Sequence, residues 1–125
     1  MYFKEELVFV KEGRSNYRIP SVVADKHGVV YAFCNDRKDT DYDGAAEVHL
    51  VGARKKPGQD WEAVRTLDSV PDWAISMGAA VYDEEEDIVR IGHIPSRAKH
   101  LFELSNAQKA TTLSYANILQ TNINC

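Results

Sequence analysis

The sequence predicts an all-β fold for the first ninety residues of this 125-residue chain. Short runs rich in Val, Tyr and Phe recur there, and Gly, Pro or acidic turn residues separate them. Closely spaced short strands with turn signals between them are typical of a sandwich, a barrel or a propeller. From about residue 90 the pattern changes, so we divide the chain into a β-rich part, 1–90, and a divergent tail, 91–125.

Each predicted strand rests on a local pattern. The first is a short apolar run that ends at a glycine. The next two are rich in β-branched and aromatic residues and flank the turn Lys26-His27-Gly28, which predicts a hairpin. A partly alternating run then suits a half-buried strand, and Pro-Gly and acidic turns separate the remaining candidates. In chain order, the predicted strands are residues 7–10, 21–25, 29–35, 46–53, 61–67, 78–82 and 87–91.

The tail has a different character. Gly92 and Pro95 interrupt the strand pattern, and the stretch 99–120 places apolar residues at roughly helical spacing. This spacing predicts an amphipathic helix at the C-terminal end. The alternative is a stretch that did not evolve with the β-rich part.

Composition narrows the classes of partner. A net charge of −4 without a dominant basic patch argues against nucleic-acid binding. No stretch approaches the ~18 apolar residues that cross a bilayer. The first ten residues carry Lys4, Glu5 and Glu6 instead of the apolar segment of a signal peptide. The chain as given is therefore expected to be cytoplasmic, with no membrane partner.

The cysteines and histidines predict no metal site, and nothing in the sequence predicts a cofactor. Cys34 lies in an apolar run and Cys125 is the last residue, which does not suggest a disulfide framework. We expect Cys34 to be a small buried hydrophobic residue. The four histidines show no ligand spacing.

Two arginines and an aspartate carry the chemistry that the sequence suggests. For a hairpin centred on its predicted turn, facing residues have numbers that sum to about 54 or 55. Arg18 then lies opposite Asp36 and Arg37, just beyond the strand ends, and Pro20 holds Ile19 extended. Like charges across a sheet are destabilising unless acidic neighbours screen them or a shared anion binds.

Asp43 lies in the loop that follows, and this loop returns to the same end of the hairpin. A guanidinium presents paired donors that suit a carboxylate. Arg18, Arg37 and Asp43 therefore predict an anion site with an adjacent acid.

Two alternatives stand beside this prediction. Arginines at strand ends are usually solvated or paired with nearby acids, and Asp36, Asp39, Asp41 and Asp43 offer such partners. The alternating aspartates also resemble the start of a Ca²⁺ loop. That interpretation fails because position twelve, counted from Asp39, is Leu50 and the flanks are β.

These residues resemble the N-terminal part of the sialidase (neuraminidase) family. Tyr17-Arg18-Ile19-Pro20 matches the family's Phe/Tyr-Arg-Ile-Pro motif. The segment Ala32-Phe33-Cys34-Asn35-Asp36-Arg37, followed by Asp43 before a strand, is similar to the family's next motif. Residues 56–61 look like a degenerate Asp-box, with Gly58 and Trp61 present, and its role is expected to be structural. The resemblance covers roughly residues 7 to 90.

The resemblance implies a fold and a set of roles. The fold would be part of a six-bladed β-propeller, about the first blade and the start of the second. Arg18 would be the first arginine of the triad that grips the sialic acid carboxylate. Arg37 would be a second substrate-facing residue, and Asp43 the general acid/base. Such enzymes use a Tyr nucleophile, and the resemblance assigns no residue of this chain to that role or to the remaining triad arginines.

Three hypotheses about function follow. The first is an exo-α-sialidase sequence, which in its family releases terminal sialic acid from glycans, truncated here and inactive alone. The second is a non-catalytic β module that binds an anionic sugar or a protein partner through the same rim. The third is an incomplete or misassembled gene product. The oligomeric state is left open.

Overall fold

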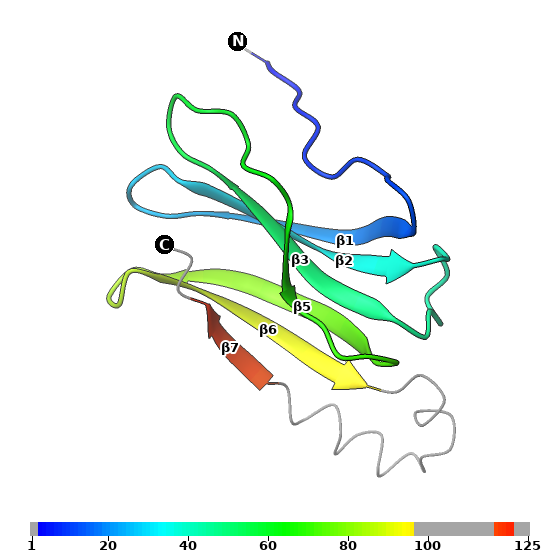
Figure 1. Ribbon diagram of the computed structural model, residues 1–125. Helices are drawn as coiled ribbons and strands as arrows, with labels where there is room; N and C mark the ends of the chain where they lie inside the picture. The colour runs from blue at the N-terminus through cyan, green and yellow to red at the C-terminus, as the bar shows by residue number, and fades with distance from the viewer. Residues whose placement is uncertain (1–2, 97–116, 122–125) are drawn as a thin grey trace.

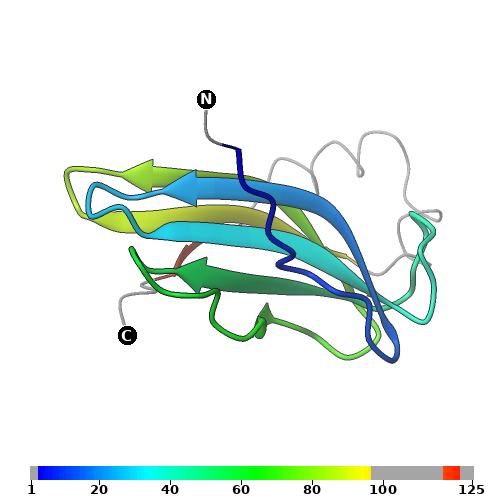
Figure 2. The same cartoon turned by 90° about the horizontal axis from the view of Figure 1, so that it is seen from above.

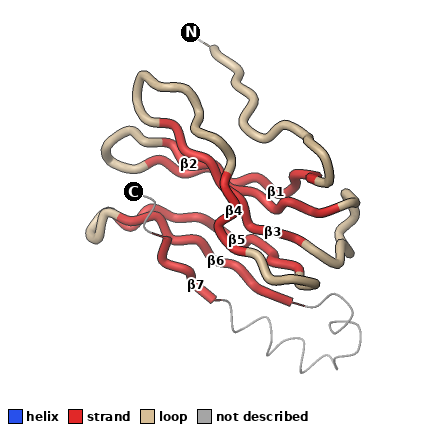
Figure 3. The backbone as a smooth tube through the Cα atoms, viewed as in Figure 1, coloured by secondary structure: helices blue, strands red, loops and turns tan. Residues whose placement is uncertain are grey.

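The computed structural model describes residues 3–96 and 117–121. None of these residues lies in a helix, so the predicted all-β fold is confirmed for this part of the chain (Figure 3). It follows that this part contains no helix able to cross a membrane. The strands are β1 (Ser15–Ala24), β2 (Val30–Lys38), β3 (Val48–Lys55), β4 (Arg65–Asp68), β5 (Ala74–Asp83), β6 (Ile88–Ser96) and β7 (Asn117–Thr121).

The strands form two antiparallel meanders that are joined at one point. In the first meander, β1 pairs with β2, β2 with β3, and β3 with β4. In the second, β5 pairs with β6 and β6 with β7. The junction is a short parallel contact between β3 and β5, where Val48 lies beside Ala74. The first meander lies above the second in Figure 1, and the two overlap when seen from above in Figure 2.

The hydrophobic core lies between the two meanders. Both contribute side chains to it, and all of these side chains are almost fully buried. They are Tyr31, Phe33, Leu50, Ile75, Val89 and Ile91. Successive side chains of a strand point to opposite faces of the sheet. The face of β2 that carries Tyr31 and Phe33 therefore also carries Asn35 and Arg37 farther along, toward the candidate site.

The predicted hairpin is confirmed as β1 and β2, but its register differs from the expectation. Near the turn, Ser21 pairs with Phe33, as predicted, whereas Arg18 pairs with Asn35. Between these pairs, Ile19 and Pro20 together oppose a single residue of β2, which is a β-bulge. Arg18 is thus within the strand and is not opposite Arg37 or Asp36.

The bulge also overturns the prediction that Ile19 is extended. Its φ is 57°, in the left-handed region that β-branched residues rarely adopt. Pro20 has no N–H to lose from the ladder, which makes it suitable for a bulge on an edge strand. Backbone strain of this kind persists only where the surrounding structure fixes it.

The predicted strand at residues 7–10 is wrong. Residues 3–14 form an N-terminal strap without strand structure. The strap lies on the face of the first meander that points away from β5–β7 (Figure 1). Glu6 accepts a hydrogen bond from Lys55 at 2.6 Å, and the ring of Phe9 lies 5.4 Å from that of Tyr17. The strap is thus held on the sheet by this ion pair and ring contact, while Leu7 and Val10 stay exposed.

The end of the β-rich part also differs from the expectation. Gly92 and Pro95 lie inside β6, which continues to Ser96, so the boundary predicted near residue 90 falls within a strand. Pro95 is tolerated because β7 pairs with β6 only as far as His93. Of the predicted helix 99–120, residues 99–116 lie outside the described residues. Its last four positions, 117–120, lie in β7 and are not helical.

Gly52 provides a test of the core packing. A Cβ at Gly52 would lie 2.8 Å from Cδ1 of Phe33 and 3.0 Å from Cδ1 of Leu67. We expect Gly52→Ala to lower the free energy of unfolding by about 1–3 kcal/mol, because Phe33 is fully buried and Leu67 packs against the same core, which limits how far either can move. Urea denaturation measures this change. Gly44→Ala is the control, because a Cβ there meets nothing within 4 Å, and equal losses in the two variants would contradict the packing.

Glu6 gives the strap a pH dependence. Hydrogen bonds from Lys55 and then Lys4 lower its pKa from 4.5 to about 2. A carboxyl with a lowered pKa in the folded state stabilises that state fully above its unfolded pKa. This contribution should therefore be lost as the pH falls from 4.5 toward 2.

The difference in stability between wild type and Glu6→Gln should shrink over that pH window. Glu5→Gln, at the exposed neighbouring position, is the charge-matched control. NMR titration of the Glu6 side-chain carbonyl gives its pKa directly. A midpoint near 4.5 would show that the strap is not held by this ion pair.

Candidate functional site

The three residues that the sequence singled out lie close together at one end of β1 and β2. Arg18 is on β1, Arg37 is on β2, and Asp43 is in the loop 39–47 that leads to β3. The same loop brings Asp41 between the two arginines. We call these four residues the arginine rim.

Arg37 is the most constrained member of the rim. Its side chain is only 9% exposed. One terminal nitrogen donates to the main-chain carbonyl of Asp41 at 2.6 Å, and the other donates to Oδ1 of Asp43 at 2.7 Å. A buried guanidinium requires such partners, because an unpaired buried charge is strongly destabilising. Arg37 therefore fixes the path of the loop.

Arg18 is more accessible. Its side chain is about half exposed, and it donates to Oδ2 of Asp41 at 2.8 Å. Beside it lies a cavity of about 250 Å³, lined by Phe9, Lys11, Asn16, Tyr17, Arg18 and Asp41. Arg18 and Arg37 are diagonal neighbours on the same face, because Arg18 pairs with Asn35. This offset separates the two positive charges.

The loop 39–47 is anchored at both ends. The main-chain N–H of Lys38 donates to the carbonyl of Glu47 at 3.0 Å. Arg14 donates to both carboxylate oxygens of Asp39, at 2.8 and 2.6 Å, and this interaction lowers the pKa of Asp39. Ala45 is buried in a small cluster with Val48 and Ala74. The two ends of the loop are thus held by contacts outside the rim, in addition to the contacts that Arg37 makes with its middle.

Asp43 differs from Asp41 in exposure. Its side chain is 97% exposed while one oxygen accepts from Arg37. A carboxylate so placed is open to solvent at the edge of the rim. The geometry therefore places an exposed carboxylate beside one half-exposed and one buried guanidinium.

The sequence placed Arg18, Arg37 and Asp43 on one rim, and the structure brings these three residues together. Asp41 was considered only as one of several possible arginine partners. The alternating aspartates indicated that carboxylates would be near, but which of them meets which arginine depends on the loop path. The simpler alternative, arginines paired with nearby acids, also describes what is seen. The functional roles of these residues stay predictions.

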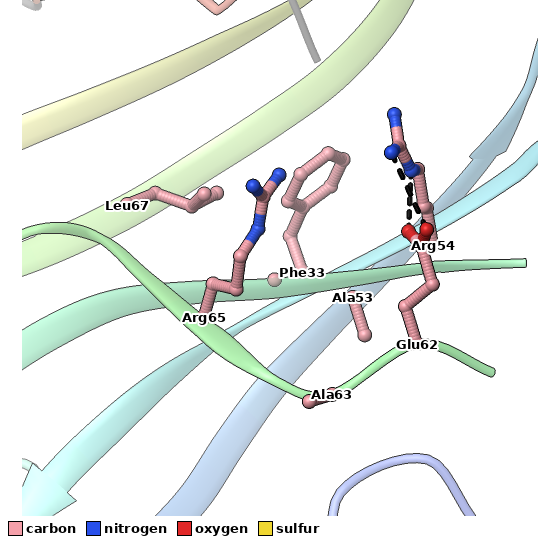
Figure 4. Close-up of a pocket in the computed structure, with 8 residues that line it drawn as sticks. Phe33, Ala53, Arg54, Glu62, Ala63, Arg65 and Leu67 are labelled. Carbon is pink, nitrogen blue, oxygen red and sulfur yellow. Dashed lines mark hydrogen bonds and ion pairs between the residues drawn. The ribbon is translucent and has the colours of Figure 1, made fainter. Parts of the chain in front are cut away.

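Other features of the described residues also bear on the choice of site. A cavity of about 470 Å³ lies between the strap and the sheet, with Ser15, Asp36 and Lys38 among its lining residues. Residues 3–96 and 117–121 contain no group of three or more His, Cys, Asp or Glu side chains that could hold a metal ion. The pocket in Figure 4 has a volume of only about 10 Å³. The Arg54–Glu62 ion pair lies at one side of it, and Arg54 lowers the pKa of Glu62. Cys34 is buried as expected, and burial raises the pKa of its thiol to about 12.

No family model, no curated protein and no solved structure matches this chain. Membership of the sialidase family, which the motifs suggest, therefore stays a prediction.

The two arginines should differ in their effect on stability. We expect Arg37→Ala to lower the free energy of unfolding by about 1–3 kcal/mol, because hydrogen bonds of a buried charged group are lost. Arg18→Ala removes a half-exposed ion pair and should cost less than ~1 kcal/mol. Urea denaturation of both variants gives the comparison. Equal losses would mean that Arg37 does not hold the loop.

Proposed function

We propose that the arginine rim binds the carboxylate of a sialic acid and that the chain carries the N-terminal part of a sialidase-type β-propeller. The observation that supports this most is the placement of two guanidiniums on one face, with an exposed carboxylate beside them. Arg18 supplies donors for the sugar carboxylate, and Arg37 is a second basic residue that faces the substrate. Asp43 is then the residue that gives or takes the proton in the family reaction.

The fold is consistent with this proposal. Two antiparallel meanders that stack face to face resemble successive blades of a propeller. The turn between β3 and β4 contains Gly58 with φ 71°, and the N–H of Gln59 donates to the carbonyl of Lys56. This turn coincides with the segment that resembles an Asp-box. Arg18 lies on β1, which is an edge strand of the sheet, where a ligand can reach it.

Hydrolysis by this chain is not part of the proposal. The family reaction requires a tyrosine nucleophile, and no tyrosine is assigned to that role. Tyr82 donates to Asp87 beside the β5–β6 turn, and burial followed by this hydrogen bond raises its pKa to about 12. Tyr115 lies outside the described residues. The chain is therefore proposed to bind sialic acid-containing glycans without turnover.

The second candidate is a non-catalytic module that binds an anionic group on a protein or a sugar other than sialic acid. It is favoured by the pairing of both arginines with loop aspartates, which is also expected of a structural ion-pair cluster. The two candidates differ in what the rim recognises.

Titration with N-acetylneuraminic acid tests the proposal. We expect NMR shifts at the amides around Arg18 and Arg37. Arg18→Ala should weaken binding roughly tenfold or more, because a charge-assisted hydrogen bond is lost. Arg90→Ala is the matched control, because Arg90 also forms ion pairs but lies at the β5–β6 turn. The methyl ester of the ligand should bind much more weakly than the acid.

No shift at millimolar ligand, or equal binding of acid and ester, would remove sialic acid as the ligand. A fluorogenic sialoside tests the absence of turnover. Clear hydrolysis that disappears in Asp43→Ala would contradict binding alone and would show that the chain is an active sialidase.

A further inference from the structure

We infer that Asp41 is a specificity-determining residue of the arginine rim, because its carboxylate occupies Arg18 as an internal competitor of the ligand. This inference rests on the proposed function and deepens it. A ligand must displace the Asp41 carboxylate to reach Arg18, and an anionic group compensates for the lost ion pair whereas a neutral one does not. Anionic ligands are thereby favoured over neutral sugars.

Asp41 contacts Arg37 through its main chain and Arg18 through its side chain. Its main-chain carbonyl accepts from Arg37 at 2.6 Å, and its side chain accepts from Arg18 at 2.8 Å. The first contact belongs to the loop and does not depend on the side chain. The second is an ion pair between two side chains that are both about half exposed. The ion pair can therefore open while the loop stays in place.

Exposure makes this exchange easy. Ion pairs between half-exposed side chains contribute little net stability, because water competes for both partners. A ligand carboxylate that binds in the adjacent 250 Å³ cavity would replace one oxygen anion by another on the same guanidinium. Lys11 lines the same cavity and adds a positive charge for the ligand. Asp41 thus tunes affinity without blocking the site.

The other aspartates of the loop do not share this position. Asp39 is held by both of its oxygens on Arg14, away from Arg18. Asp43 contacts Arg37 through one oxygen and is otherwise exposed. Two arginines and two aspartates leave the rim without net charge, so removing the Asp41 charge makes it positive. Asp41 is the only member of the rim whose carboxylate contacts Arg18 in the described part of the chain.

Asp41→Asn tests this inference, because it keeps the main-chain contact to Arg37 and removes the side-chain charge. Sodium acetate is the probe, and NMR shifts of the Arg18 and Arg37 amides report binding. We expect acetate to bind roughly two- to fivefold more tightly than in wild type, the equivalent of a half-exposed ion pair. Asp60→Asn makes the same charge change in the exposed β3–β4 turn and should leave the affinity unchanged.

An acetate affinity that does not rise in Asp41→Asn, or that rises equally in Asp60→Asn, overturns the inference. If Asp41→Asn does not fold, Asp41→Ser removes the same charge and retains the carbonyl. N-acetylneuraminate in the same titrations tests the proposed function separately. If acetate gains affinity but N-acetylneuraminate binds no better than acetate, the competition by Asp41 stands and the sialic acid proposal fails.

Discussion

The burial of the polar end of β2 is the constraint on which the rest of the structure depends. β2 lies between β1 and β3 in the sheet, and all of its residues from Tyr31 to Arg37 are buried. A buried polar group must find a partner within the protein. Asp36 accepts hydrogen bonds from Ser15 and Lys38, and Arg37 donates to the loop 39–47. The start of β1 and the path of the loop follow from these requirements.

The alternation of side chains along β2 places core residues and a candidate site residue on the same face of the sheet. Phe33 packs in the core, and Arg37, four residues later, lies on the same face. β1 meets this face through a bulge that inserts one extra residue, so Arg18 and Ser21 both lie on it although they are three residues apart. Without the bulge, their odd spacing would place them on opposite faces. The strained backbone at Ile19 therefore places a functional candidate and a core-facing residue on the same side.

The two arginines of the rim differ in how accessible their charges are. Arg37 is buried, and both of its terminal nitrogens are engaged by the loop, so it is the less accessible half of the proposed anion site. Arg18 is half exposed, and its partner Asp41 is exposed to the same degree. Opposite charges in water exchange partners at little cost. The same four residues thus combine a buried ion pair with a half-exposed one, and the second is the one that we propose a ligand replaces.

The sequence by itself determined the β character, the hairpin and the presence of Arg18, Arg37 and Asp43 on one rim. These follow from local rules of turn chemistry, strand pattern and antiparallel pairing. The strand predicted at residues 7–10 was wrong because this segment is held over the sheet by contacts of single side chains, such as Phe9 with Tyr17, and forms no strand. The prediction that the strand pattern ends at Gly92 and Pro95 was wrong, because β6 continues through both residues. Whether a proline fits in a strand depends on which neighbouring strand needs its N–H, and β7 pairs with β6 only as far as His93.

Only the tertiary structure decided the register at Arg18 and the choice of Asp41 as its partner. Local preference places Ile19 extended before Pro20, and the bulge overrides that preference because contacts on both sides of it are fixed. Four aspartates near the arginines are equivalent in sequence. They become different once the loop is anchored by Arg14 and by the buried Ala45. Anchors far apart in the chain set the position of each carboxylate, and local sequence rules do not encode such contacts.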